Sequence, residues 1–137
     1  MYSPRGIGVL LAVGLLLIAS MANAQQTQRI AMGVWGGQHI TIDVGSRTAT
    51  IEFDCAHGEI EGPLVVDGEG KFRLPGTFTR ERGGPIRADD VPQPEPATYT
   101  GTIKGNRMTL TLKLSNEDDD ETFTLEKGKQ GDLFKCK

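Results

Sequence analysis

Apolar and polar residues alternate with a period of two through much of the chain beyond residue 30. The first example puts six apolar side chains on one face of a predicted pair of strands: Ile40, Ile42, Val44, Ala49, Ile51 and Phe53. Side chains point alternately to opposite faces of a strand, so this pattern predicts a hairpin with one buried face. A two-residue turn at Gly45-Ser46 would place Ile42 opposite Ala49. On the polar face, the same register would place His39 opposite Glu52.

A second alternation, from Tyr99 to Leu114, predicts another hairpin with its tip at Gly105-Asn106. Pairing outward from the tip gives three opposed pairs on the apolar face: Ile103 with Met108, Gly101 with Leu110, and Tyr99 with Leu112. Because a glycine faces a leucine here, we expect room at Gly101 for a neighbouring ring.

Shorter alternations predict the remaining strands. One pair of strands would flank a turn at Asp67–Gly70, with the strands at 64–66 and 71–79. Pro75-Gly76 interrupts the second of these strands, so we expect a bulge or a sheet edge there. Two last strands are predicted at 122–126 and 132–136.

The spacing of these segments predicts the fold class. No stretch beyond the first 24 residues shows a helical period over ten or more residues. About eight short strands separated by turns predict an all-β fold, a small antiparallel up-and-down β-barrel. Closure into a barrel would leave no exposed sheet edge. A two-sheet β-sandwich uses the same alternation and is the alternative.

The start of the chain has the composition of a signal peptide. Arg5 precedes an apolar run from Ile7 to Ala19, and Ala22-Asn23-Ala24 is an A-x-A cleavage site. The apolar run is shorter than the roughly 20 residues that a membrane helix needs. We therefore expect residues 1–24 to be removed. The remainder, 25–137, would be a single β-barrel domain that is periplasmic or secreted and has no membrane association after cleavage.

Net charge narrows the choice of partner. Without Arg5, the 15 basic residues of the chain fall to 14 against 18 acidic ones, a balance of −4. The sequence shows no basic patch, and this argues against a nucleic-acid partner. We expect a monomer that uses no cofactor.

Cys55 and Cys136 are the two cysteines of the chain, and both follow the signal peptide. In an oxidising compartment we expect them to form one disulfide, which would tie the end of an early strand to the last one. His57 would then be a solvated turn residue. The alternative is a free Cys55 thiol that acts as a nucleophile beside His57.

Two histidines and nearby carboxylates raise the question of a metal site. His39, Glu52 and His57 offer ligand atoms, but the chain contains no His-x-His or His-x-x-x-His spacing. The acidic run at 116–121 lacks the alternating ligands and the central glycine of an EF-hand loop. We therefore expect no metal site.

The segment 81–97 shows neither the period of a strand nor that of a helix. It contains four of the seven prolines and the run Gly83-Gly84-Pro85-Ile86-Arg87. Long irregular loops on small rigid domains often carry function, so this segment is a candidate binding loop. The alternative is that it is disordered.

Gly33-Val34-Trp35 resembles the Gly-x-Trp signature of the calycins, the lipocalin and avidin group of up-and-down barrels. In that group the tryptophan closes one barrel end beneath a basic residue from the last strand, a role that the resemblance assigns to Lys135 or Lys137. The string A-T-I-E-F-D-C-A-H-G-E-I, with G-G-P-I-R later in the chain, also resembles uncharacterised exported bacterial proteins. This second resemblance implies no activity.

Together these features predict an exported binding protein without enzymatic activity. The calycin resemblance implies a small apolar ligand at the barrel mouth, in contact with Trp35, Phe72, Phe78, Tyr99 and Met108. The alternative is a protein-binding module, such as a periplasmic protease inhibitor, that acts through Arg82, Pro85, Ile86 and Arg87. The two hypotheses place the site either at the barrel mouth or on the loop at 81–97.

Overall fold

The computed structural model describes residues 26–85 and 87–136. The predicted signal peptide at 1–24 lies outside the described residues. Within those two ranges the chain forms ten strands and no helix. The strands are β1 (Gln28–Arg29), β2 (Gly33–Gly37), β3 (Ile40–Val44), β4 (Thr48–Phe53), β5 (Ala56–Glu61), β6 (Val65–Val66), β7 (Lys71–Arg80), β8 (Glu95–Lys104), β9 (Arg107–Leu114) and β10 (Glu121–Lys127).

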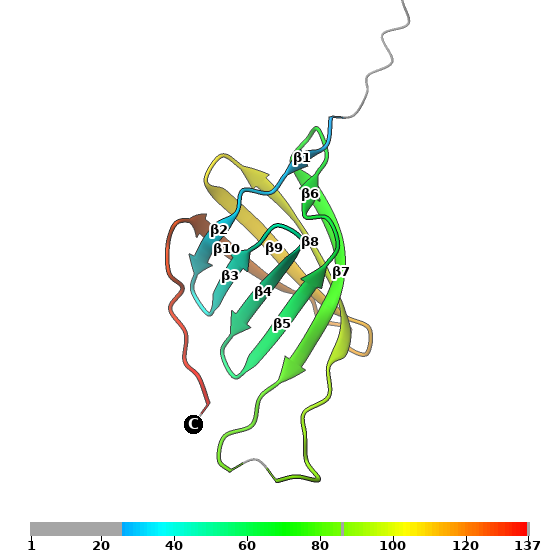
Figure 1. The fold of residues 1–137 in the computed structure, drawn as a ribbon, viewed down its shortest axis with the longest axis vertical. Helices are drawn as coiled ribbons and strands as arrows, with labels where there is room; N and C mark the ends of the chain where they lie inside the picture. Colours follow the sequence, from blue (N-terminus) through cyan, green and yellow to red (C-terminus); the bar gives the residue numbers. More distant parts are fainter. Residues whose placement is uncertain (1–25, 86, 137) are drawn as a thin grey trace, which may run out of the picture.

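Eight of these strands form a closed antiparallel barrel in the order β10-β2-β3-β4-β5-β7-β8-β9 (Figure 1). Neighbours in the barrel follow one another along the chain, which makes it an up-and-down barrel. β1 and β6 pair with each other in a separate two-stranded sheet. The predicted all-β barrel is confirmed, and the closed sheet excludes the two-sheet sandwich.

The predicted register of the first hairpin, β3–β4, is wrong by two residues. Ile42 pairs with Ile51 rather than with Ala49, and three residues, 45–47, separate the two strands instead of two. The amide of Gly45 donates to the carbonyl of Thr48 at 2.9 Å and closes this longer turn. A slip of two residues keeps every side chain on its face, so the predicted apolar set is still buried.

The same shift separates His39 from Glu52. Glu52 pairs with Thr41 on one side and with His57 on the other. His39 lies in the β2–β3 turn with a φ of 67°, in the left-handed region. The predicted His39–Glu52 pair is therefore wrong, because the observed register places Glu52 opposite Thr41, two residues nearer the turn.

The second hairpin, β8–β9, has the predicted register, with Tyr99 opposite Leu112, Gly101 opposite Leu110 and Ile103 opposite Met108. A Cβ atom on Gly101 would lie 2.6 Å from Cζ of Phe72, closer than two carbon atoms can approach. The predicted room for a ring is confirmed, and the Phe72 ring occupies it.

The shorter predicted strands are confirmed only in part. β6 pairs with β1 and not with the strand that follows it, whereas β7 pairs with β5 and β8. The ladder between β5 and β7 ends at the Ile60–Gly76 pair, which confirms the sheet edge predicted at Pro75-Gly76. Residues 132–136 form no strand, and a single bridge joins Asp132 to Gln38.

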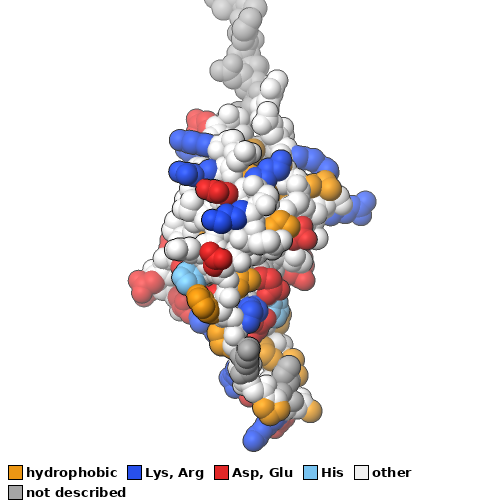
Figure 2. Space-filling model, turned by 90° about the vertical axis from the view of Figure 1, so that its left-hand side faces the viewer, with side chains coloured by type: hydrophobic (Ala, Val, Ile, Leu, Met, Phe, Trp, Pro, Cys, Tyr) orange, Lys and Arg blue, Asp and Glu red, His pale blue; other side chains and the backbone are white. Residues whose placement is uncertain are grey.

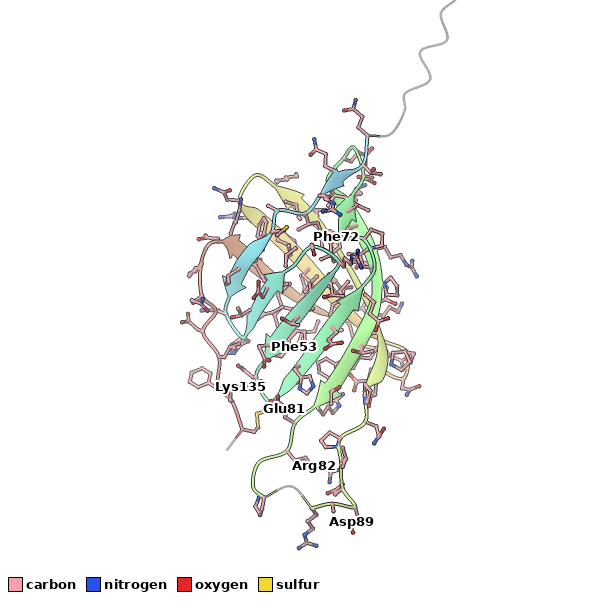
Figure 3. All side chains as sticks on the ribbon, in the orientation of Figure 1. Phe53, Phe72, Glu81, Arg82, Asp89 and Lys135 are labelled. Carbon is pink, nitrogen blue, oxygen red and sulfur yellow. A yellow bond between two sulfur atoms is a disulfide. The ribbon has the colours of Figure 1, made fainter. Side chains whose placement is uncertain are left out.

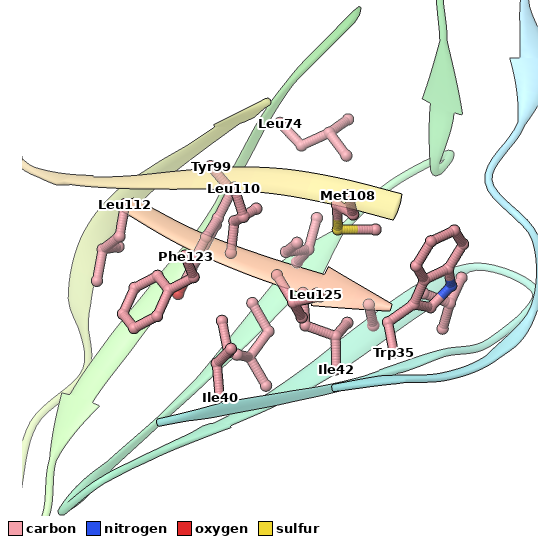
Figure 4. Close-up of a cluster of buried hydrophobic side chains, with 14 of the residues drawn as sticks. Trp35, Ile40, Ile42, Leu74, Tyr99, Met108, Leu110, Leu112, Phe123 and Leu125 are labelled. Carbon is pink, nitrogen blue, oxygen red and sulfur yellow. The ribbon is translucent and has the colours of Figure 1, made fainter. Parts of the chain in front are cut away.

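Side chains fill the barrel interior (Figure 4). The largest fully buried ones are Trp35, Ile40, Ile42, Ile51, Tyr99, Met108, Leu110 and Leu125. An internal cavity among the core side chains has a volume of about 10 Å³, room for one water at most. Burial raises the pKa of the Tyr99 phenol, whose hydroxyl donates to the Thr77 carbonyl at 2.6 Å. The interior is a packed core with no space for a ligand.

The chain after β10 forms a tail, residues 128–136, that crosses the outside of β2 and β3 (Figure 1). A Cβ atom on Gly36 would collide with the Lys129 carbonyl, so the glycine lets the tail lie directly against β2. The amide of Gly131 donates to Oγ1 of Thr41 at 2.9 Å and extends the contact to β3. The tail thus reaches the barrel end from which the β7–β8 connection projects.

Candidate functional site

The connection between β7 and β8 projects beyond one end of the barrel (Figure 1). It spans residues 81–94, here called the 81–94 loop, because β8 begins at Glu95. The predicted boundary at residue 97 is therefore too late, since Glu95 to Ala97 already pair with β7. The amide of Glu81 donates to the carbonyl of Cys55 at 2.8 Å and fixes the start of the loop against the β4–β5 turn.

A cavity of about 950 Å³ lies between the 81–94 loop and the outer face of β5 and β7. We call it the loop groove. Its floor consists of His57, Glu59 and Glu61 from β5 with Thr77 and Thr79 from β7. The loop supplies one wall, which includes Pro85, Val91, Pro92 and Pro94, and the tail supplies Lys135 and Cys136. The volume is at the upper end of the range for small-molecule sites.

The alternation of the two strands determines which side chains form this floor. On β5, the buried residues Ala56, Gly58 and Ile60 point into the barrel, so the residues between them point outward. Thr79 points to the outer side of β7 and is nevertheless only 7% exposed. A polar residue on the outside of a barrel is normally solvated, and its burial shows how closely this part of the sheet is covered.

Lys135 joins the tail to the β4–β5 hairpin and to the base of the 81–94 loop (Figure 3). Its ammonium group lies 2.7 Å from Oε2 of Glu52 and 2.8 Å from Oε2 of Glu81. It also donates to the carbonyls of Phe53 and Ala56, each at 3.0 Å. Burial disfavours the charged amine, but the hydrogen bonds to the two carboxylates hold the pKa of Lys135 above its usual value.

Glu81 is shared between the tail and the floor of the loop groove. Its Oε1 lies 3.0 Å from Nδ1 of His57, while Oε2 contacts Lys135. Burial disfavours the carboxylate, yet the hydrogen bonds from Lys135 and His57 keep the pKa of Glu81 below its usual value. Glu81 is therefore ionised at neutral pH. Its contacts join the base of the 81–94 loop to the tail and to β5.

The remaining charges of the loop groove differ in how they are paired. Nη1 of Arg82 donates to Oδ2 of Asp90 at 2.6 Å, a contact that joins the two sides of the 81–94 loop. Glu59 and Glu61 are exposed on the floor and make no ion pair with any residue that the structure describes. The groove therefore presents two available carboxylates and one cation, Arg87, that also has no ion pair with any described residue.

Cys55 and Cys136 form the predicted disulfide, with their Cα atoms 4.9 Å apart. Neither cysteine is free, so the oxidised protein offers no thiol nucleophile beside His57. His57 is not a turn residue as predicted but a member of β5, with its ring bonded to Glu81. The turn residue is Cys55 itself, at the tip of the β4–β5 hairpin.

The three residues considered as metal ligands are held by three different partners. Nδ1 of His39 lies 2.5 Å from Oδ2 of Asp54, while His57 contacts Glu81 and Glu52 contacts Lys135. Among residues 26–85 and 87–136, no three His, Cys, Asp or Glu side chains are placed to hold one metal ion.

The five side chains predicted to contact an apolar ligand do not converge on one cavity. Trp35 lies at one end of the core, and Phe78 borders a hollow at the other end. Phe72 and Met108 line the internal cavity of about 10 Å³, and Tyr99 is completely buried. All five belong to the packed core, and Figure 4 labels three of them, Trp35, Tyr99 and Met108.

The barrel mouth next to the 81–94 loop has a hollow of about 550 Å³, here called the mouth hollow. Three rings form its base: Phe53 lies 5.3 Å from Phe78 and 5.4 Å from Phe123, measured between ring centroids. Each of these rings is at most 7% exposed, so together they close the mouth. The guanidinium of Arg80 lies 5.5 Å from the Phe78 ring and makes the rim charged.

Trp35 and Lys135 lie at opposite ends of the barrel. The indole Nε1 of Trp35 donates to the carbonyl of Ala31 at 3.1 Å, near the β8–β9 tip. Lys135 is bonded at the β4–β5 turn, so it does not cover Trp35 as the calycin resemblance implies. The other candidate for that role, Lys137, lies outside the described residues.

Three of the four predicted loop residues, Arg82, Pro85 and Arg87, line the loop groove, while Ile86 lies outside the described residues. The floor residues, above all Glu59, Glu61 and Thr77, were not among the site residues predicted from the sequence. The sequence does contain a signal for these residues. In H-x-E-x-E of β5 and in T-x-T-x-E at the end of β7, the polar residues occupy every second position and therefore share the outer face of the strand. Nothing in the sequence indicated that the two outer faces lie under the same loop.

No family model matches the chain, and no curated protein or solved structure shows significant similarity to it. In the ranges that the structure describes, no helix is long and apolar enough to cross a membrane. The loop groove therefore has to be interpreted from its own residues.

Proposed function

We propose that this chain is an exported, non-enzymatic binding protein whose ligand lies in the loop groove. The observation that carries the proposal is the contrast between the loop groove, about 950 Å³, and the internal cavity, about 10 Å³. A ligand site must offer space that side chains do not fill. The signal-peptide pattern and the Cys55–Cys136 disulfide support export, because disulfides persist in oxidising compartments.

The lining of the loop groove suggests the chemistry of the ligand. Glu59 and Glu61 point outward two residues apart on β5, ~7 Å from each other along the strand. Opposite them, Val91 and two of the loop prolines provide an apolar wall. The complementary ligand is elongated, with an apolar body and more than one cationic group. Figure 2 shows hydrophobic side chains gathered on the projection at the lower end of the molecule, next to charged ones.

A calycin-like guest at the barrel mouth has less support. The mouth hollow is rimmed by charged side chains, and the rings of Phe53, Phe78 and Phe123 close its base. An apolar guest could reach the barrel interior only by displacing these rings from the core. The proposal therefore places the ligand in the loop groove and not at the mouth.

An NMR titration of the mature protein tests the proposal, with 1,8-diaminooctane as a probe that has an apolar body and two cationic ends. Amide shifts are expected at His57–Glu61 and at Thr77–Glu81. A Glu59→Gln/Glu61→Gln double variant should bind about tenfold more weakly at low salt, because two charge pairs are lost. Glu126→Gln, an exposed change on β10, is the matched control and should bind normally.

Two outcomes of this titration would contradict the proposal. Shifts confined to Phe53, Phe78 and Phe123 would move the site to the mouth hollow. No shift at any amide, with either the diamine or octan-1-ol as an uncharged comparison, would leave the loop groove without a ligand of this class.

A second candidate function is docking of the 81–94 loop into a protein partner such as a protease. Val91 is 57% exposed on this projecting loop, and binding residues are concentrated on loops that a rigid scaffold positions. Arg82 and Arg87 would direct the loop to a trypsin-like enzyme. Incubation with trypsin distinguishes an inhibitor from a substrate. An inhibitor forms a stable complex and is cleaved slowly, whereas rapid cleavage after either arginine excludes protease inhibition.

A further inference from the structure

The tail is attached to a barrel that is already complete without it. β10 closes the sheet against β2, and the tail follows as residues 128–136. Its carbonyl at Asp132 accepts a hydrogen bond from the amide of His39 at 2.8 Å. Its amide at Phe134 donates to Oδ1 of Asp54 at 2.7 Å. These two contacts reach the turns of the β2–β3 and β4–β5 hairpins. The first part of the tail is also bonded to the barrel strands, since the amide of Asp132 donates to the Gly37 carbonyl at 3.0 Å.

The tail also forms part of the loop groove. Lys135 and Cys136 line the groove, and Lys135 holds Glu81 at the base of the 81–94 loop. Moving the tail would therefore widen the groove at one side and release the base of the loop. The position of residues 134–136 decides the shape of the proposed site.

The disulfide that holds this tail is accessible. Cys136 is exposed, and Cys55 is half-buried at the tip of the β4–β5 hairpin. Cys55 has a φ of 51°, in the left-handed region that a β-carbon disfavours and where glycine or asparagine is usual. Disulfides that are exposed or attached to a strained backbone are the ones that exchange with thiols. Neither cysteine belongs to a barrel strand.

We propose that the Cys55–Cys136 disulfide is a thiol–disulfide exchange site whose reductant is a dithiol, and that its reduction opens the loop groove. A thiolate of the dithiol attacks the exposed Sγ of Cys136, the bond between the two protein sulfurs breaks, and Cys55 leaves as a thiolate. The second thiol of the reductant then attacks the mixed disulfide and releases Cys136. Two electrons and two protons pass to the protein, and the dithiol is oxidised to a disulfide.

Reduction changes the tail and leaves the barrel in place. Without the covalent bond, Lys135 and Phe134 are held only by contacts that are partly exposed to water, which are individually weak. The core side chains and all eight barrel strands keep their partners. The functional consequence, a groove that admits or releases its ligand, rests on the function proposed above.

Amide hydrogen exchange on the folded protein during a dithiothreitol titration tests this proposal, with alkylation to report the cysteines. When both cysteines become alkylated, exchange at His39 and Glu81 is expected to accelerate by about tenfold or more. Exchange at Ile51 and Leu110, in the core strands, should not change. A Cys136→Ser variant should show the same accelerated amide exchange at His39 and Glu81 without a reductant.

Two results would overturn the inference. Loss of protection at Ile51 and Leu110 together with His39 would show that the disulfide stabilises the whole barrel and not only the tail. Unchanged exchange at His39 and Glu81 after complete alkylation would show that the tail stays in place. If Cys136→Ser does not fold, the dithiothreitol titration of the folded native protein still tests whether reduction releases the tail. Neither readout needs a ligand, so failure of diaminooctane to bind either redox form would remove the proposed function and leave the exchange site intact.

Discussion

The Glu81 carboxylate and the Lys135 ammonium form an ion pair at 2.8 Å that joins the base of the 81–94 loop to the tail. The same ammonium contacts Glu52 on β4, so one side chain links three segments that are distant in the sequence. These contacts organise the side of the loop groove, and the first two predictions follow from them.

Replacing Lys135 by methionine should loosen the tail and leave the barrel folded. The change removes two ion pairs and two hydrogen bonds to backbone carbonyls, in a partly exposed setting. We expect the free energy of unfolding to fall by roughly 0.5–1.5 kcal/mol, measured by urea denaturation. Lys113→Met, on the exposed side of β9, is the control and should lose much less. Equal losses in the two variants would show that the contacts of Lys135 contribute nothing.

Acid should weaken the protein through Glu81. Its pKa in the folded state lies below its usual 4.5, because hydrogen bonds from Lys135 and His57 outweigh the effect of burial. A lowered pKa means that the stabilisation is complete above pH 4.5 and is lost as the pH falls through the folded value. We expect urea midpoints between pH 7 and pH 3 to fall more steeply for the native protein than for Glu81→Gln. Parallel curves would contradict this role for Glu81.

Tyr99 should resist titration for as long as the barrel is folded. The chain has two tyrosines, and Tyr2 lies in the predicted signal peptide, so the tyrosinate absorbance of the mature protein reports Tyr99 alone. Burial raises the pKa of Tyr99 above its usual value of 10.0, which means that stability is lost as the pH rises above that value. We expect tyrosinate absorbance to appear together with unfolding. Absorbance that rises near pH 10 in folded protein would show that the phenol is accessible.

Gly36→Ala should displace the tail, because a Cβ atom would meet the backbone carbonyl of Lys129. Backbone cannot move aside as a flexible side chain can, so we expect faster amide exchange at His39 and a loss of roughly 1–3 kcal/mol in unfolding free energy. Gly68→Ala is the control, since a Cβ atom there has no neighbour closer than 4.0 Å. Wild-type exchange at His39 in Gly36→Ala would show that the tail does not depend on this glycine.

The local alternation was sufficient to assign the buried faces of the β3–β4 and β8–β9 hairpins. The alternation from Ile40 to Phe53 assigned the correct faces even though the predicted register was wrong by two residues, because a shift of two preserves the side-chain period. With two cysteines in the chain only one intramolecular disulfide could form, and it does. These features follow from residues close together in the sequence or from simple counting.

The location of the candidate site follows from how distant segments of the chain fold together. Glu59, Thr77 and Lys135 come from β5, β7 and the tail, and nothing local to any of them predicts that they share a groove. Their meeting depends on closure of the barrel, on a glycine at Gly36 that admits the tail, and on the disulfide that holds it. Burial follows a two-residue period that can be recognised in the sequence of each strand separately. Contacts between distant segments depend instead on the geometry of the whole sheet.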